Sequence, residues 1–193
     1  MHIRADMRGN VANLLRIYAQ TSQQEREQGN SWYTTANEQA AQLATRYNTD
    51  ITVAAAVIAA LSPSLNWDLN LQAAAAVFAH VATATRLPSL PSYGQNVARA
   101  KHIASTNDIT SLSGQKVTAF YHNIAYPQVA GPVTIDRHML RAWLDLPNKG
   151  PLDCKNTVYQ AAVADFTTAA NLENLLPHNF QAIIWIAVRP TKE

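Results

Sequence analysis

Cysteine is nearly absent from this sequence: the 193 residues include a single one, Cys154. One thiol cannot close an internal disulfide. It also cannot supply the ligands of a four-cysteine zinc site or of a cysteine-bound iron–sulfur cluster. The histidines show no compact zinc-binding spacing either. The sequence therefore predicts a protein without a metal or other cofactor, in which Cys154 is chemically inert.

Long apolar runs are also missing. No stretch of about eighteen apolar residues is present to cross a bilayer. The first twenty residues carry Arg4, Asp6 and Arg8, where a secretory signal needs an apolar core. We therefore expect a cytoplasmic protein that has no membrane partner.

Charge is sparse and almost balanced. Fifteen Lys and Arg residues face thirteen Asp and Glu residues, which gives a net charge of +2. Many proteins without a nucleic-acid partner carry a similar charge. The bulk charge therefore neither indicates nor excludes binding to DNA.

Glycine is scarce, with six residues, whereas alanine occurs in runs such as Ala54–Ala56 and Ala73–Ala76. Alanine is the best helix former, and its small side chain lets helices pack closely. Valine and threonine do not form the alternating pattern of strands. The length suits one apolar core. We expect an all-α fold in which residues 1–193 form a single domain.

Apolar residues recur at helical spacing along most of the chain. Residues 51–61 are apolar on every side, which indicates a buried central helix ending at Ser62-Pro63. Gly29-Asn30 is expected to separate two helices, and Asp68 to cap another. Any division into two lobes is expected near residues 87–92. The expected helices are 9–22, 31–47, 51–61, 68–83, 95–105, 108–112, 114–125, 136–144, 155–170 and 177–189.

One segment contains residues suited to catalysis. It reads Leu-Ser-Gly-Gln-Lys-Val-Thr-Ala, from Leu112 to Ala119. Gly114 permits a sharp turn and opens a helix with one apolar face. Lys116 lies at the edge of that face, in the first turn, where the positive end of the helix dipole disfavours an ammonium ion. A lysine so placed is a candidate nucleophile, because only a neutral amine attacks.

A second segment, Ile135-Asp136-Arg137-His138, begins shortly afterwards, and Asp136 follows Lys116 by twenty residues. Asp136 is expected at the N-terminus of a helix. Its carboxylate can accept a proton from a nucleophile, or stabilise positive charge that develops on a sugar.

Both segments resemble the helix–hairpin–helix DNA glycosylases of the endonuclease III superfamily. That family's hairpin usually reads Leu-Pro-Gly-Val-Gly-x-Lys-Thr-Ala, and its second segment reads Val-Asp-Thr/Arg-His. Upstream, Ile58 to Ser62 followed by Ala73-Ala74 is similar to the segment that inserts a residue into DNA. The similarity covers about residues 51–145. It implies an all-α, two-lobed fold that holds duplex DNA between the lobes and cleaves the N-glycosidic bond of a flipped nucleotide.

The resemblance implies roles for individual residues. Lys116 matches the lysine that forms a Schiff base in bifunctional members, which also nick the strand at the abasic site. Asp136 matches the family's invariant aspartate. Gly114 and its neighbour Gln115 match the hairpin, whose backbone N–H groups hold a DNA phosphate.

Further candidates lie near these segments. Arg137 and Arg141 are four residues apart on one helix face and are expected to contact phosphates. In this family a side chain fills the space that the flipped nucleotide leaves in the DNA. The candidates for that position are Ser64, Asn66 and Trp67. The candidates for the base pocket are Tyr121, by stacking, and His138.

Each of these residues also has a simpler, structural interpretation. Lys116 would be a solvated lysine at a helix start, and Asp136 an N-cap that stabilises its helix by about 1 kcal/mol. Trp67 would pack over a helix start. Trp143 and Trp185 fit apolar helix faces and are expected in the core.

The leading hypothesis is a monomeric DNA glycosylase that removes a damaged or modified base and has abasic-site lyase activity. The hairpin is two residues shorter than the family pattern and also lacks its proline and its second glycine. This difference supports an alternative: a DNA-binding module that has lost base excision. Compact members of this type are associated with bacteriophage genomes. A third hypothesis is therefore a phage enzyme of base hypermodification, acting in the host cytoplasm.

Overall fold

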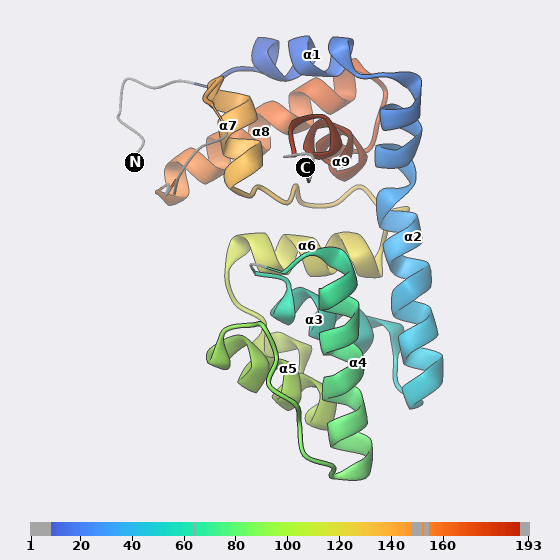
Figure 1. Cartoon of the computed structure of the whole chain (residues 1–193). Helices are drawn as coiled ribbons and strands as arrows, with labels where there is room; N and C mark the ends of the chain where they lie inside the picture. The colour runs from blue at the N-terminus through green and yellow to red at the C-terminus, as the bar shows by residue number, and fades with distance from the viewer. Residues whose placement is uncertain (1–8, 64, 148–151, 153–154, 190–193) are drawn as a thin grey trace. The chain divides into compact units, whose positions relative to one another are not determined.

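The computed structural model describes residues 9–63, 65–147, 152 and 155–189 (Figure 1). These residues form helices and no β-strand, which confirms the predicted all-α class. Within the same residues, none of the helices combines the length and apolarity needed to span a membrane. The helices are α1 (Val11–Gln20), α2 (Gln23–Tyr47), α3 (Ile51–Leu61), α4 (Trp67–Thr83), α5 (Gly94–Thr106), the 3-10 helix η1 (Ile109–Ser111), α6 (Gln115–Ala125), α7 (Arg137–Leu144), α8 (Asn156–Leu172) and α9 (Pro177–Val188).

The chain divides into two compact units. The first unit comprises residues up to Tyr33 and from Gln128 onward, and the second unit comprises Thr34–Pro127. Residues 87–92, where a lobe boundary was predicted, lie within the second unit and connect α4 to α5. The chain passes from one unit to the other within α2 and again after α6.

In the first unit, α1, α7, α8 and α9 pack around one apolar core. Phe166 of α8 and Phe180 of α9 are fully buried there, and their rings meet edge to face with centroids 6.2 Å apart. Leu14 of α1 and Met139 of α7 are buried in the same core. Trp143 is 4% exposed in this core, as predicted.

In the second unit, α3 is the central helix. Its residues from Val53 to Leu61 are all buried, and it contacts α4, α5 and α6 (Figure 1). Asp50 caps its N-terminus by accepting the N–H of Thr52 on Oδ1 at 2.7 Å. A helix without a polar face must be covered on all sides. The predicted central helix over residues 51–61 is therefore confirmed.

The predicted break at Gly29-Asn30 is wrong, because α2 runs continuously from Gln23 to Tyr47. A capping box starts it: the N–H of Ser22 donates to Oε2 of Glu25 at 2.8 Å, and the N–H of Glu25 donates to Oγ of Ser22 at 3.2 Å. Gly29 is buried within the helix, and a Cβ there would lie 2.5 Å from the Cα of Ile183 in α9. Glycine at this position therefore serves close packing between helices.

The predicted cap of the next helix is also wrong, because Asp68 is not the N-cap. Helix α4 begins at Trp67, and Asn66 caps it by accepting the N–H of Leu69 on Oδ1 at 2.9 Å. Asp68 instead lies in the first turn, where its charge complements the positive end of the helix dipole. Both Asn and Asp are favoured N-cap residues, so their types alone do not choose between the two positions.

Candidate functional site

Gly114 makes the turn that begins α6. Its φ of 90° lies in the region that favours glycine. Gly114 is the N-cap of α6, and it makes no side-chain hydrogen bond to the first turn. Apart from Gly114 itself and its two neighbours in the chain, no atom lies within 4 Å of the place where a Cβ would be. A ligand can therefore approach this backbone closely, at the positive end of the α6 dipole. Gln115, the next residue, is exposed.

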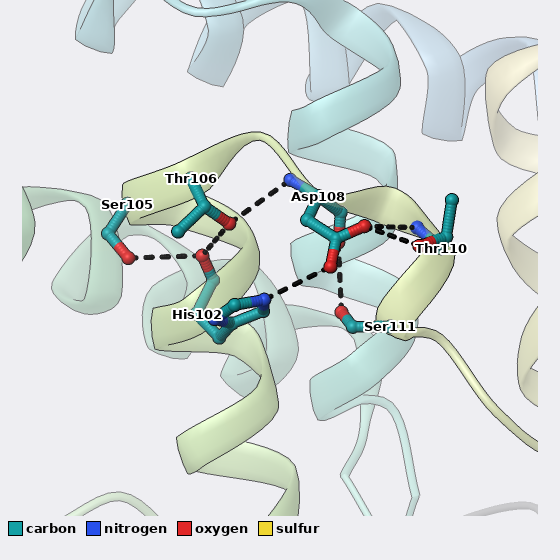
Figure 2. A network of polar contacts seen from close by, with 6 residues as sticks. All are labelled: His102, Ser105, Thr106, Asp108, Thr110 and Ser111. Carbon is teal, nitrogen blue, oxygen red and sulfur yellow. Dashed lines mark hydrogen bonds and ion pairs between the residues drawn. The ribbon is translucent and has the colours of Figure 1, made fainter.

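A polar network fixes the chain between α5 and this turn (Figure 2). His102 of α5 pairs with Asp108, with 3.1 Å between Nε2 and Oδ2. Oδ1 of Asp108 accepts the N–H of Thr110 at 3.1 Å, which caps η1. The hydroxyl of Thr106 accepts the N–H of Asp108 at 3.2 Å and donates to the carbonyl of His102 at 2.8 Å. Helix η1 comes shortly before the Gly114 turn. By fixing η1, this network also limits the conformations that the chain can adopt at that turn.

We expect acid to remove the stabilisation that Asp108 provides. Hydrogen bonds with the Thr110 side chain and then with His102 hold the pKa of this carboxyl below its ordinary value of 3.8. A pKa lowered by folding stabilises the native state fully above the ordinary value, and this stabilisation is lost as the pH falls through the folded value. The free energy of unfolding should be compared for wild type and Asp108→Asn between about pH 6 and pH 2. The wild-type advantage should shrink toward the acid end, and an advantage that is constant over this range would contradict the prediction.

Lys116 follows the turn in α6 and is half-buried. Arg16 forms an ion pair with Asp145, and His102 contacts Asp108; neither of these contacts involves the Lys116 amine. The predicted nucleophile is thus placed two residues from an open backbone turn.

Tyr121, further along α6, is half-buried as well. Burial, followed by its hydrogen bond with Tyr126 and by the charges of Tyr126 and Asp50, raises the pKa of its phenol to about 12. The phenol is therefore protonated near neutral pH. It can stack or donate a hydrogen bond, but it cannot serve as a general base.

Two of the residues predicted to enter DNA, Asn66 and Trp67, lie at the start of α4. Asn66 is exposed, and its side chain caps the helix. Trp67 is half-buried: its indole N–H donates to Oε1 of Gln39 at 2.6 Å, and its ring meets Phe120 edge to face at 6.4 Å. These contacts fit the simpler interpretation, in which Trp67 packs over the helix start. Ser64 lies outside the described residues.

Asp136, in the first unit, is the N-cap of α7, as predicted. Its Oδ1 accepts the N–H groups of His138 at 2.8 Å and of Met139 at 2.9 Å. Its Oδ2 accepts the indole N–H of Trp185 in α9 at 3.3 Å. Two helices therefore hold a carboxylate that remains half-exposed. Each oxygen has two lone pairs, so Oδ2 can also accept a proton or hydrogen bond from a ligand.

The contact of Trp185 with Asp136 was not predicted from the sequence. Trp185 packs partly against the core of the first unit, as its place in an apolar stripe predicts. Its indole N–H nevertheless orients Asp136, and the guanidinium of Arg189 lies 5.2 Å from its ring centroid. Tryptophan joins a large apolar surface to one hydrogen-bond donor, so an apolar stripe does not show where that donor points.

The two arginines of α7 differ in exposure. Arg137 is exposed, whereas Arg141 is 4% exposed, and Nη1 of Arg141 lies 3.5 Å from the carbonyl of Arg137. The predicted pair of phosphate contacts therefore does not form one exposed face, and Arg137 is the better placed of the two. His138 is half-buried beside Arg137, and with Arg141 it lines a cavity of about 190 Å³.

The structure places Gly114, Lys116 and Tyr121 in the second unit and Asp136 and His138 in the first. In the part of the chain that is described, no three His, Cys, Asp or Glu side chains gather as metal ligands. Cys154 lies outside that part.

These features define an all-α protein with an open glycine turn beside a lysine, and with a carboxylate that caps a second helix. The chain belongs to the family described as DUF7178, a family of unknown function, whose model matches residues 3–192. Comparison with curated proteins and with solved structures gave no match.

Proposed function

We propose that the protein is a DNA glycosylase of the helix–hairpin–helix type that uses Lys116 as an amine nucleophile and also nicks DNA at abasic sites. The observation that carries the proposal is the open Gly114 turn, with a half-buried lysine two residues later. The order of η1, a short turn and α6 supports a shortened helix–hairpin–helix at this place.

The Gly114 turn supplies the groups that a DNA phosphate requires. Backbone N–H groups at a helix N-terminus point toward a ligand, and the helix dipole there favours negative charge. A phosphate needs close approach to the backbone, which the empty space around Gly114 permits. Such a contact would fix the register of the DNA strand without reading its sequence.

In the proposed reaction the neutral Lys116 amine attacks C1′ of the nucleotide. The bond from C1′ to the base breaks, the base leaves with its electron pair and takes up a proton, and the amine loses one. The bond between C1′ and the ring oxygen then breaks, the oxygen takes up a proton, and a protonated imine remains between C1′ and the lysine nitrogen. Loss of a C2′ proton then expels the 3′ phosphate and nicks the strand.

Asp136 is proposed to assist this chemistry. Its carboxylate is fixed by two backbone donors and one indole donor, and Oδ2 retains accepting capacity. It would act as a general base and stabilise positive charge that develops on the sugar. Arg137 would contact a phosphate, while Tyr121 and His138 are the proposed contacts of the base.

Borohydride trapping tests the proposal, because hydride reduces the imine to a stable amine that links protein to DNA. The substrates are oligonucleotides that carry an abasic site, uracil, oxidised pyrimidines or hypermodified bases. A covalent adduct on abasic DNA is the expected result. Release of a base without an adduct would remove the lyase step and leave a glycosylase in which Asp136 positions water.

A DNA-binding module without catalysis is the second candidate, because the open Gly114 turn can hold a phosphate whether or not chemistry follows. It predicts duplex binding that weakens steeply with salt, since phosphate contacts release counterions. Such binding without base release or strand scission on any of these substrates would favour the module.

Replacing Asp136 with asparagine is expected to lower the rate of base release by about 100-fold, because the general base and the negative charge are lost. Asparagine still caps α7, so the free energy of unfolding should change by less than about 0.5 kcal/mol. Single-turnover rates and chemical denaturation measure the two effects. Asp145→Asn, which changes the exposed carboxylate at the other end of α7, is the matched control. Equal losses of rate in both variants would argue against a role for Asp136.

A further inference from the structure

A cavity of about 540 Å³ lies in the second unit, where the ends of three helices meet. Its walls include Tyr47 at the end of α2, Val81 in the last turn of α4 and Ser105 in the last turn of α5. Sites for small organic ligands usually enclose about 300–1,000 Å³. The cavity is thus large enough for such a molecule, and it involves none of the residues proposed for DNA chemistry.

Most of the charge around this cavity is negative, although the N-terminus of α3, which Asp50 caps, contributes positive charge. The C-terminal end of a helix carries about half a negative charge, and three such ends contribute here. Asp50 is the one charged side chain among the residues that line the cavity. Hydrogen bonds with the hydroxyl and then the N–H of Thr52 hold the pKa of its carboxyl below the ordinary value. Both bonds end on Oδ1, at 2.6 and 2.7 Å, so Oδ2 can accept a donor from a ligand.

Aromatic rings form part of the wall. Tyr47 and Phe78 stack with ring centroids 5.5 Å apart and an interplanar angle of 18°. Ring faces attract cations and also pack well against methylene groups. The lining therefore combines an anion, carbonyl ends of helices and aromatic carbon.

Two histidines on the neighbouring helices have partners outside the lining of the cavity. His80 of α4 contacts the carbonyl of Thr85, and His102 of α5 pairs with Asp108. Arg46 lies 5.4 Å from the ring centroid of Tyr47 and is the competing cation at this wall. An incoming cation would displace it or share the ring with it.

We infer that this cavity binds a small organic cation that carries an ammonium or guanidinium group. Asp50 forms the ion pair, and the terminal carbonyls of α2 and α5 accept the remaining N–H groups. Tyr47 and Phe78 contact the carbon chain. The inference does not depend on the proposed DNA chemistry.

Isothermal titration calorimetry on the full chain tests this inference, with 1,4-diaminobutane and arginine methyl ester as probes and glutamate as the anionic control. At least one cationic probe should bind with a Kd below about 1 mM. Asp50→Asn should weaken binding at least about tenfold, the loss of one charged contact. Asparagine caps helices as well as aspartate does, so this variant keeps the start of α3.

Two further variants complete the test. Asp68→Asn removes an exposed carboxylate from the opposite end of α4 and should leave binding unchanged. Arg46→Gln should tighten binding, because the competing cation is gone. No heat from either cation, equal binding of glutamate, or unchanged affinity in Asp50→Asn would overturn the inference.

Discussion

Replacing Lys116 with alanine is expected to reduce borohydride trapping on abasic DNA by about 1,000-fold, since removing a covalent nucleophile removes the step itself. Lys116 is half-buried in the first turn of α6. The yield of covalent adduct per unit time, resolved by denaturing electrophoresis, measures the effect. Duplex affinity at fixed salt should change far less, because one lysine is one phosphate contact at most.

Two matched variants distinguish the loss of the amine nucleophile from the loss of positive charge. Lys116→Arg keeps a cation but offers no neutral amine, so it should trap as poorly as Lys116→Ala. Lys101→Ala removes a half-buried lysine of α5 in the same unit and should trap normally. If Lys116→Ala still forms the adduct at the wild-type rate, the imine is formed elsewhere and the assignment of Lys116 is wrong.

Replacing Gly29 with alanine is expected to destabilise the protein by about 3 kcal/mol, at the upper end of what an added methyl group costs in a packed core. The new Cβ would lie 2.5 Å from the Cα and 2.6 Å from the backbone N of Ile183. Backbone atoms cannot rotate aside as a flexible side chain can, so α2 and α9 would have to separate. The melting temperature should fall by about 6–12 °C for a chain of this size.

Gly94→Ala is the control for that prediction. Gly94 also lies in a helix, at the start of α5, but apart from its chain neighbours and the backbone of its own helix no atom is within 4 Å of its Cβ position. Alanine there should be neutral or slightly stabilising, because it restricts the unfolded chain and favours the helix. Similar losses of stability at both positions would show that helix geometry, and not the contact with Ile183, makes Gly29 necessary.

Most of the helices were predictable from the sequence because local residue patterns mark their ends. The all-apolar run of α3 and the Ser62-Pro63 stop gave its bounds, and Asp136 marked the start of α7. The continuous α2 could not be predicted in the same way. Gly29-Asn30 has the composition of a helix end, and only contact with Ile183, far away in the sequence, explains a glycine inside the helix.

The candidate site was predictable only in part. The positive φ at Gly114 and the cap by Asp136 follow from residue type and position, and the structure has both. The burial of Arg141 does not follow, because helical spacing shows which residues share a face and not how deeply each one lies. The hydrogen bond from Trp185 to Asp136 joins residues 49 positions apart, which no local pattern encodes.

The first unit is built from two segments of the chain that flank the second unit in the sequence. This arrangement affects the order in which the protein folds during synthesis. The core of the first unit joins Leu14 to Phe180, and the side chain of Asn13 donates to the carbonyl of Trp143, 130 residues away. The residues of the second unit leave the ribosome in one uninterrupted segment, Thr34–Pro127. The apolar face of α1 therefore cannot be buried until α7, α8 and α9 have been synthesised. During that time it stays exposed and can bind chaperones. Slowed translation after residue 127 should lengthen this exposure and increase aggregation of the nascent chain.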